Sequence, residues 1–265
     1  MTFASLAENK QTNHLTNRLT NMNSHTTLRR REKVSRDKAV QEMMKDIKID
    51  EFLESHGYKT VTGVDEAGRG PLAGPVVAAA VIIPDNVTID GLDDSKKLSA
   101  EMREALFTEI AERELPVSIG IIDNKTIDQL NILRASLMAM RRSVCGLKPK
   151  PQCCLVDGSF EIPNLSMAQM SIVGGDSLHP AIMAASIVAK VTRDRIMRQY
   201  DEIYPQFSFA EHVGYPTEKH LKELKKHGPT SIHRRSFKPV AEALERVGVC
   251  ATGKIVLSRT TLVTN

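Results

Sequence analysis

The sequence predicts one α/β domain, because short apolar strands alternate with amphipathic helical stretches from about Lys59 to Val247. The longest apolar stretch runs from Pro75 to Pro84, is closed by a proline at each end and has the β-branched content of a buried strand. No stretch approaches the roughly 20 uninterrupted apolar residues that a membrane helix needs. We therefore expect a globular protein without membrane contact.

The chain of 265 residues divides into three predicted parts. Residues 1–58 read as a largely disordered basic extension, with room for a short helix, because an Asn- and Thr-rich leader precedes the run Arg29-Arg30-Arg31-Glu32-Lys33. This run is either a solvated tail or an electrostatic arm for nucleic acid. Residues 59–247 form the domain, and residues 248–265 are a tail without a periodic pattern.

The elements of the domain follow in order. Strands are expected at residues 60–64, 76–83, 117–122, 153–156 and 171–173. Ser99 can cap a helix in which Leu106 and Ile110 share one face, and a second helix carries Leu133 to Val144. Further helices are expected at residues 180–200, 217–227 and 239–246.

Charge and cysteine content restrict the partner and the compartment. The formal net charge of +4 fits a polyanionic partner, although many unrelated proteins share such a charge. The four cysteines form no CxxC pair, which favours a reducing compartment and predicts a cytoplasmic protein.

Carboxylates follow three of the predicted strands. Asp65-Glu66 closes the first, Asp157-Gly158 follows the fourth, and Gly174-Gly175-Asp176 follows the fifth. Ligands in α/β sheets gather at the carboxyl ends of strands, so these acids can converge. Neighbouring side chains on a strand point to opposite faces, so Asp65 and Glu66 reach one site only if the strand breaks there, at Gly68 and Gly70.

Clustered carboxylates repel one another unless cations neutralise them. An all-oxygen ligand set selects hard cations, so we expect Mg²⁺ or Mn²⁺, with two ions roughly 4 Å apart during chemistry on a phosphodiester. The plain alternative is that Asp157 or Asp176, taken alone, is only a turn residue.

The segment Gly68-Arg69-Gly70-Pro71-Leu72-Ala73 matches a loose dinucleotide-binding pattern. That pattern should open a helix, whereas a strand is expected after Gly74. A helix in that place would favour a dinucleotide-dependent enzyme, and a strand would exclude it.

Several blocks of sequence resemble ribonuclease HII in order and spacing. They are DEAGRGPLAGPVVAAAVI (from Asp65), DSKKLS (from Asp94), LNILRAS (from Leu130), VDG (from Val156), GDS (from Gly175), AASIVAKVTRDR (from Ala184), HVGYPTEKH (from His212) and HRRSF (from His233). The resemblance covers about Val61 to Leu244. It implies a ribonuclease H-like fold, with a mixed central sheet flanked by helices and a C-terminal helical part.

The resemblance also implies an activity and its substrates. The expected enzyme hydrolyses RNA in RNA–DNA hybrids and incises duplex DNA 5′ of a single embedded ribonucleotide, leaving 3′-hydroxyl and 5′-phosphate ends by two-metal-ion catalysis. A monomer is expected, and a sliding-clamp contact is left open. The alternative is a non-catalytic RNA–DNA binding protein with the same fold.

The resemblance implies roles for individual residues, by their positions in the matching blocks. Asp65, Glu66, Asp157 and Asp176 match the family's metal-binding acids and are expected to be catalytic, with Asp65, Glu66 and Asp157 ligating metal. Gly68, Arg69 and Gly70 match the residues that contact the ribose 2′-hydroxyl, and Tyr215 matches the tyrosine beside the ribonucleotide junction. The sequence departs from the family pattern at Gly174, where a lysine is usual, and at Asp93, where asparagine is common.

The remaining polar residues allow simpler interpretations. Lys96 precedes a helix start, so we expect it to contact a phosphate. Lys190 and Asp194 can form a surface ion pair, or Lys190, Arg193 and Arg195 can border the nucleic acid. Surface or substrate-side positions are expected for the histidines His212, His220, His227 and His233.

Overall fold

The structure is a computed structural model that describes residues 49–246. Most of the predicted extension and the tail at 248–265 therefore lie outside the described residues. Helix α2 (Ile49–Ser55) falls within the predicted extension, across the boundary between two units of the chain, residues 1–52 and 53–265.

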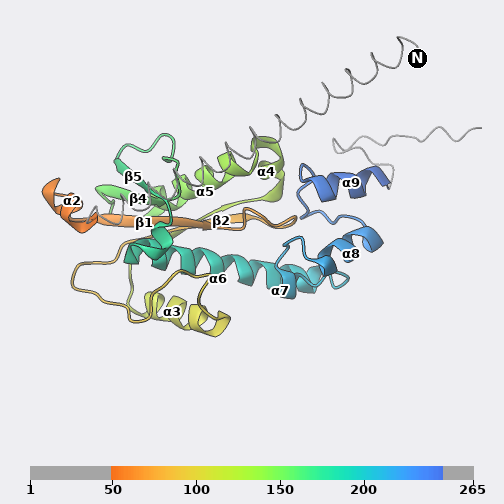
Figure 1. The fold of residues 1–265 in the computed structure, drawn as a ribbon, viewed down its shortest axis with the longest axis horizontal. Helices are drawn as coiled ribbons and strands as arrows, with labels where there is room; N and C mark the ends of the chain where they lie inside the picture. Colours follow the sequence, from red (N-terminus) through yellow and green to blue (C-terminus); the bar gives the residue numbers. More distant parts are fainter. Residues whose placement is uncertain (1–48, 247–265) are drawn as a thin grey trace, which may run out of the picture. The chain divides into compact units, whose positions relative to one another are not determined.

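A five-stranded mixed sheet forms the centre of the second unit (Figure 1). Its strands are β1 (Val61–Ala67), β2 (Val76–Val81), β3 (Val117–Ile122), β4 (Cys153–Asp157) and β5 (Ala168–Ile172), in the order β3-β2-β1-β4-β5. β2 runs antiparallel to β1 and β3, whereas β4 runs parallel to β1 and β5. The three parallel strands thus end at the same edge of the sheet.

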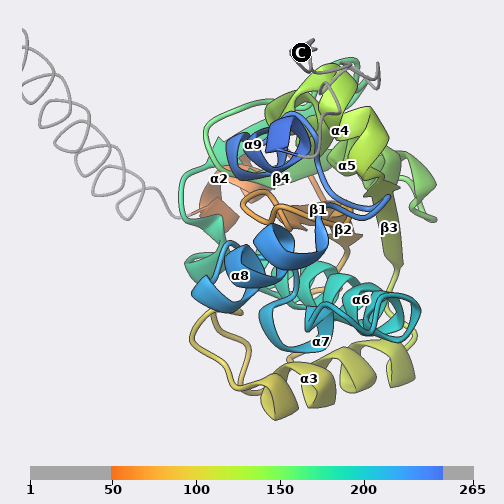
Figure 2. The same ribbon diagram turned by 90° about the vertical axis from the view of Figure 1, so that its right-hand side faces the viewer.

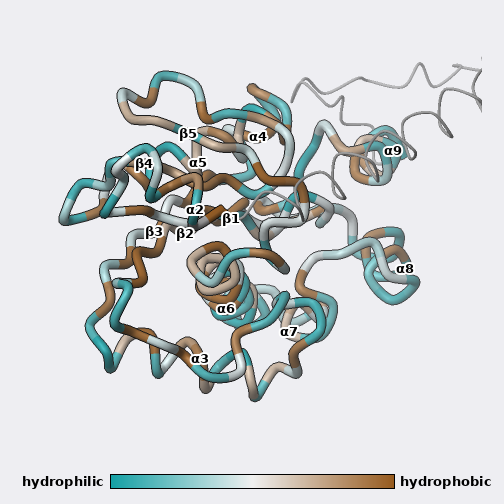
Figure 3. Tube along the Cα trace, turned by 60° about the vertical axis from the view of Figure 1, so that its left-hand side comes forward, coloured by the Kyte–Doolittle hydropathy of each residue, from teal (hydrophilic) through white to brown (hydrophobic). Residues whose placement is uncertain are grey.

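Helices cover both faces of the sheet (Figure 2). α5 (Ile132–Gly146), preceded by α4 (Asn124–Leu130), covers one face, and α6 (Pro180–Ile203), backed by α3 (Ala100–Glu112), covers the other. Alternation along β2 sends Ala78 and Ala80 toward α5 and Ala79 and Val81 toward the α3 and α6 side. Figure 3 shows apolar residues along the strands, as expected for a sheet buried on both faces.

The start of α6 packs directly against β1. A Cβ atom at Gly63 would lie 2.2 Å from the carbonyl carbon of Ala181, which no side chain tolerates. Gly63 therefore lets the first turn of α6 approach the strand that carries Asp65.

The C-terminal helices are α7 (Phe209–His212), α8 (Glu218–His227) and α9 (Lys238–Arg246). Buried residues of these helices, including Phe209 and Val240, form a core with Phe207, which precedes α7, and with Leu72 and Ala73 from the loop after β1. This part of the chain therefore supports the loop rather than standing apart from it.

The predicted fold class is confirmed, and the errors are local. The strand predicted to end at Val64 continues to Ala67, and the fifth strand lies at Ala168–Ile172 rather than at 171–173. α4 and the short α7 were not predicted. Ser99 caps α3 as expected, with its side chain accepting a hydrogen bond from the Met102 amide. None of the described helices is long and apolar enough to cross a membrane.

Candidate active site

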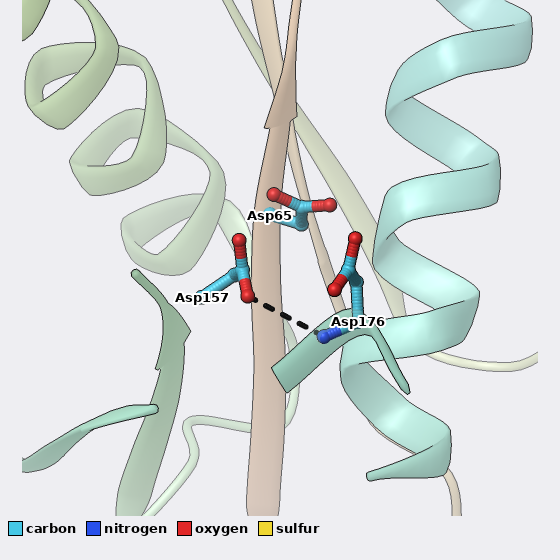
Figure 4. A group of neighbouring side chains, drawn as sticks. All are labelled: Asp65, Asp157 and Asp176. Carbon is cyan, nitrogen blue, oxygen red and sulfur yellow. Dashed lines mark hydrogen bonds between the residues drawn. The ribbon is translucent and has the colours of Figure 1, made fainter. Parts of the chain in front are cut away.

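Three carboxylates meet at the edge where the parallel strands end (Figure 4). The parallel register pairs Val64 with Val156, so Asp65 and Asp157 are neighbours one residue further on. Asp176 follows β5, and oxygens of Asp65, Asp157 and Asp176 all lie within 4.8 Å of one another. Residues distant in sequence therefore form one negatively charged group.

A glycine turn places Asp176. Gly174 adopts a left-handed conformation with φ of 72° and leads into the 3-10 helix η1 (Gly175–Ser177). The Asp176 amide points at Oδ1 of Asp157 across 3.4 Å, and a Cβ atom at Gly175 would lie 2.6 Å from the Ile182 side chain. The backbone at Gly174-Gly175 thus holds Asp176 against Asp157.

Glu66 lies outside this three-carboxylate group. It pairs with Ala78 in the antiparallel ladder, whereas Asp65 pairs with Ala79, so alternation directs the two acids to opposite faces. The strand does end before Gly68, where the break was expected, but Glu66 itself is still paired within the ladder. Glu66 instead accepts a hydrogen bond from Arg69 at 3.1 Å, while still lining the pocket that contains Asp65 and Asp157.

Burial and mutual repulsion disfavour charge on these acids. Burial, followed by the charges of Glu66 and Asp157, raises the pKa of Asp65 well above its ordinary value. Burial also raises the pKa of Glu66 to about 7, although Arg69 opposes this shift. Burial and the charge of Asp176 raise the pKa of Asp157. Ionising these acids therefore costs free energy, and a bound cation would lower that cost.

The donor chemistry fits a hard divalent cation. Asp65 and Asp176 are buried, Asp157 is half-buried, and the group contains only carboxylate oxygens. Hard ions such as Mg²⁺ and Mn²⁺ prefer such ligands. The best-placed set is Asp65, Asp157 and Asp176, which differs from the predicted ligands Asp65, Glu66 and Asp157.

Lys96 contacts the same cluster. Its Nζ lies 2.6 Å from Oδ2 of Asp176 and 3.8 Å from Asp94, although 76% of its side chain is exposed. Partial burial lowers the pKa of Lys96, but the hydrogen bond and charge of Asp176 outweigh it and raise the pKa to about 12. Lys96 thus places a positive charge at the rim of the site.

Two buried arginines hold the glycine-rich loop from behind. Arg193 donates hydrogen bonds to the carbonyl oxygens of Pro75, Ala73 and Val213, and Arg234 donates to those of Gly68, Arg69, Gly74 and Pro75. Every hydrogen bond described for these guanidiniums ends on a backbone carbonyl. Burial lowers the pKa of Arg193 to about 10 and, together with the charge of Arg193, that of Arg234 to about 9. The prediction that Arg193 borders nucleic acid is therefore wrong, because this side chain is buried beneath the loop.

The fit between loop and arginine requires glycine. Gly68 has φ of +97°, and a Cβ atom there would lie 2.1 Å from Nε of Arg193. A Cβ atom at Gly70 would lie 3.4 Å from the Tyr215 ring. A side chain at Gly68 would therefore displace the guanidinium, whereas one at Gly70 would begin in ordinary van der Waals contact with the tyrosine.

A pocket of about 280 Å³ joins the predicted site residues other than Asp176. Asp65, Glu66, Gly68, Arg69, Gly70, Lys96, Asp157 and Tyr215 line it, with Ala67, Ser95, Arg103, Ser186 and Lys190. The strand β2 follows Gly74, which excludes the dinucleotide-binding interpretation. Lys190 and Asp194 form the expected ion pair at 2.7 Å, partly buried.

Sequence reasoning missed the buried arginines and the histidines. His212, His220 and His233 are buried, so their predicted surface positions are wrong. The one signal for these residues in the sequence was the density of polar residues in the blocks HRRSF and HVGYPTEKH. No periodic pattern reveals that such side chains turn inward to bind backbone.

Comparison with known proteins agrees with this geometry. A family model described as ribonuclease HII matches residues 62–240. Ribonuclease HII of Ruminiclostridium cellulolyticum is 49% identical over 201 residues, covering 76% of this chain and 78% of that protein. The crystal structure of ribonuclease H2 from Pyrococcus horikoshii OT3 matches with a TM-score of 0.59 and 27% identity, covering 71% and 98% of the two chains. The structure of the PCNA:RNase HII complex from Archaeoglobus fulgidus matches with a TM-score of 0.54 and 27% identity, covering 68% and 95%.

Proposed function

The chain belongs to the ribonuclease HII family, whose members cleave RNA in RNA–DNA hybrids, and on this premise we propose that it also incises duplex DNA at single embedded ribonucleotides. Cleavage on the 5′ side leaves 3′-hydroxyl and 5′-phosphate ends. The observation that carries the proposal is the meeting of Asp65, Asp157 and Asp176 beside the glycine-rich loop and Tyr215.

The acids form the reaction centre. Asp65, Asp157 and Asp176 would hold Mg²⁺ or Mn²⁺, and Glu66 lies in the same pocket as a further acid. The chemistry that a pair of such ions supplies when bound is activation of the attacking water and stabilisation of the leaving oxygen. The chain itself contributes a rigid carboxylate frame, since Asp65 and Asp157 sit on adjacent strands and Asp176 on a tight turn. The described pocket therefore needs no protein nucleophile.

The glycine-rich loop presents backbone donors. In a trans peptide the N–H and C=O groups point in opposite directions. Because Arg234 binds the carbonyls of Gly68 and Arg69, the N–H groups of Arg69 and Gly70 point away from it. We assign these donors and the Arg69 side chain to the ribonucleotide, whose 2′-hydroxyl distinguishes it from DNA.

Tyr215 is assigned to the sugar beside the cut. Its side chain is 39% exposed and packs next to Gly70, so loop and ring form one surface. A ring in this place can test for the absence of a 2′-hydroxyl on the following residue. Lys96, at the opposite rim, is assigned to a phosphate.

Incision of a duplex containing one ribonucleotide, with Mg²⁺ or Mn²⁺, tests the proposal. We expect one cut on the 5′ side of the ribonucleotide, no cut in chelator, and loss of turnover with retained binding for Asp157→Asn. Asp85→Asn, the same change on an exposed residue, is the matched control. A wild-type protein that binds the duplex without cutting it would favour the non-catalytic alternative.

The compartment, the oligomeric state and a protein partner form a separate set of proposals. A cytoplasmic location, a monomeric state and a sliding-clamp contact are proposals, the last supported by the structural neighbour solved with PCNA. Size-exclusion chromatography with and without a clamp protein tests the last two together.

A further inference from the structure

Three buried histidines lie directly beneath the segment Gly214–Tyr215. His212 belongs to α7, His220 to α8, and His233 follows α8. The rings of His212 and His220 stack with centroids 4.2 Å apart, and Phe207 and Phe209 enclose the group. The proposed reaction gives none of these histidines a role, although burying imidazoles is costly unless their nitrogens are paired.

A series of hydrogen bonds fixes which ring nitrogen carries the proton in His233 and in His220. The Thr230 amide donates to Nδ1 of His233 at 2.9 Å, so that nitrogen carries no proton and Nε2 of His233 does. Nε2 of His233 faces Nε2 of His220 at 3.1 Å, which must then accept. The proton of His220 therefore sits on Nδ1 and is donated to the carbonyl oxygen of Tyr215 at 2.9 Å.

A second ring binds the other side of the same segment. The Gly214 amide donates to Nδ1 of His212 at 3.1 Å, so Nε2 of His212 carries the proton and donates to Glu223 at 3.0 Å. Glu223 also accepts from the amide and hydroxyl of Ser208.

The remaining backbone groups of this segment are paired as well. The Leu72 amide donates to Gly214 O at 2.7 Å, and the Tyr215 amide donates to His212 O at 2.8 Å. The Tyr215 carbonyl, which His220 binds, also accepts from the Thr217 amide at 2.8 Å. Both peptide groups are thus held, and one of these bonds ties them directly to the loop that carries Gly70.

Space filling alone does not explain this arrangement. Phenylalanine would fill the same aromatic cluster, as Phe207 and Phe209 already do. The imidazoles add a directed donor to Tyr215 O that depends on one particular tautomer of His220. Protonation of either ring would set two N–H groups against each other, and burial keeps both rings neutral by lowering the pKa of His220 to about 4 and that of His233 to about 3.

We infer that His220, oriented by His233, is a positioning residue that holds Tyr215 at the ribonucleotide junction and so sets the preference for that junction. This inference rests on the proposed function, because it assigns the network to substrate choice rather than to bond cleavage. The chemical step itself should depend little on it.

Nitrogen NMR of histidine-labelled protein tests the proton positions without any substrate. We expect His220 in the Nδ1–H form and His212 and His233 in the Nε2–H form at pH 7, assigned with single His→Asn variants. An Nε2–H tautomer or a charged ring at His220 would overturn the inference, whatever the protein's activity.

Incision assays test the role. His220→Phe keeps a ring but removes the imidazole donor, so that Tyr215 O accepts only from the Thr217 amide. This variant should lower the ratio of junction to all-RNA cleavage roughly fivefold, the size expected for one hydrogen bond. His220→Asn, whose amide can occupy the place of Nδ1–H, should recover part of that ratio. His227→Phe, the same change on an exposed ring of α8, should leave the ratio unchanged.

A double variant completes the design. Tyr215→Ala combined with His220→Phe should lower the ratio no further than Tyr215→Ala alone, since the histidine acts through the tyrosine. Additive losses, or equal losses on both substrates, would mean that His220 only stabilises the fold and would overturn the inference. Wild-type protein that cuts neither substrate would instead overturn the proposed function.

Discussion

Replacing Asp65 by asparagine should make the metal-free protein more stable while removing most of its stabilisation by metal. The asparagine keeps the volume of the side chain and an oxygen that can accept the Glu66 amide, which Asp65 now accepts at 2.7 Å. What is lost is one negative charge among acids that already repel one another.

The magnitude follows from the geometry. Two unit charges about 5 Å apart repel by about 3 kcal/mol at an effective dielectric constant near 20. Asp157 and Asp176 lie at about this distance from Asp65, and Glu66 adds a further repulsion, but partial protonation already relieves much of it. We therefore expect a gain of about 2 kcal/mol in the free energy of unfolding, or about 4–8 °C in Tm for a domain of this size.

Thermal unfolding at pH 7.5 measures both effects. In chelator the variant should unfold at higher temperature than the wild type. At an Mn²⁺ concentration about 100 times the dissociation constant, the wild type should gain about 2.7 kcal/mol and the variant much less. Asp85→Asn should behave as wild type in both conditions. A variant that is less stable in chelator and gains equally from metal would refute the picture of a strained carboxylate site.

Three further outcomes are expected. Arg234→Met should lower the free energy of unfolding by about 3 kcal/mol in denaturant titration and reduce cleavage, because the carbonyls of Gly68, Arg69 and Gly74 lose their arginine donor and that of Pro75 keeps only Arg193; Arg198→Met, which removes a surface ion pair, should change neither. Tyr215→Ala should reduce the preference for the ribonucleotide junction roughly tenfold while cleavage of all-RNA strands is retained, a change of about 1.4 kcal/mol in transition-state discrimination; equal losses on both substrates would contradict this. The free energy of unfolding should fall as the pH falls from 6.5 toward 4, because His220 and His233 bind protons in the unfolded protein but stay neutral in the folded one, where their pKa values are about 4 and about 3. The loss is roughly 2–3 kcal/mol for each ring. His220→Phe should reduce this loss in unfolding curves measured from pH 4 to 8.

The fold was predictable where burial sets the pattern of apolar residues along a strand or helix. β2 reads as a continuous apolar run because helices cover both of its faces, and α3 and α5 show apolar stripes because each has one exposed side. The boundary of β1 is shifted because ladder pairing outweighs local strand propensity. Strand propensity disfavours acids, so Asp65 and Glu66 look like an end, yet the ladder to β2 carries them on as strand.

The site was predictable only in part. Acids after parallel strands suggested the meeting of Asp65, Asp157 and Asp176, because strand order and direction convert sequence distance into proximity. The supporting residues were not predictable in this way. Arg193 and Arg234 bind backbone atoms of distant segments, and such contacts leave no period and no local spacing in the sequence. The three histidines bind backbone atoms two to five residues away, but their burial depends on aromatic packing between α7, α8 and the residues around them.

The bond from Arg234 to Gly68 also has a consequence for synthesis of the protein. Its partners are separated by 166 residues along the chain. At roughly 5–20 residues per second, about 10–30 seconds pass between the emergence of the loop and that of the arginine that orders it. A ribosome-bound chain that already carries Asp65, Asp157 and Asp176 still lacks the support for its glycine-rich loop, so activity toward nucleic acid should begin only after Arg234 has emerged.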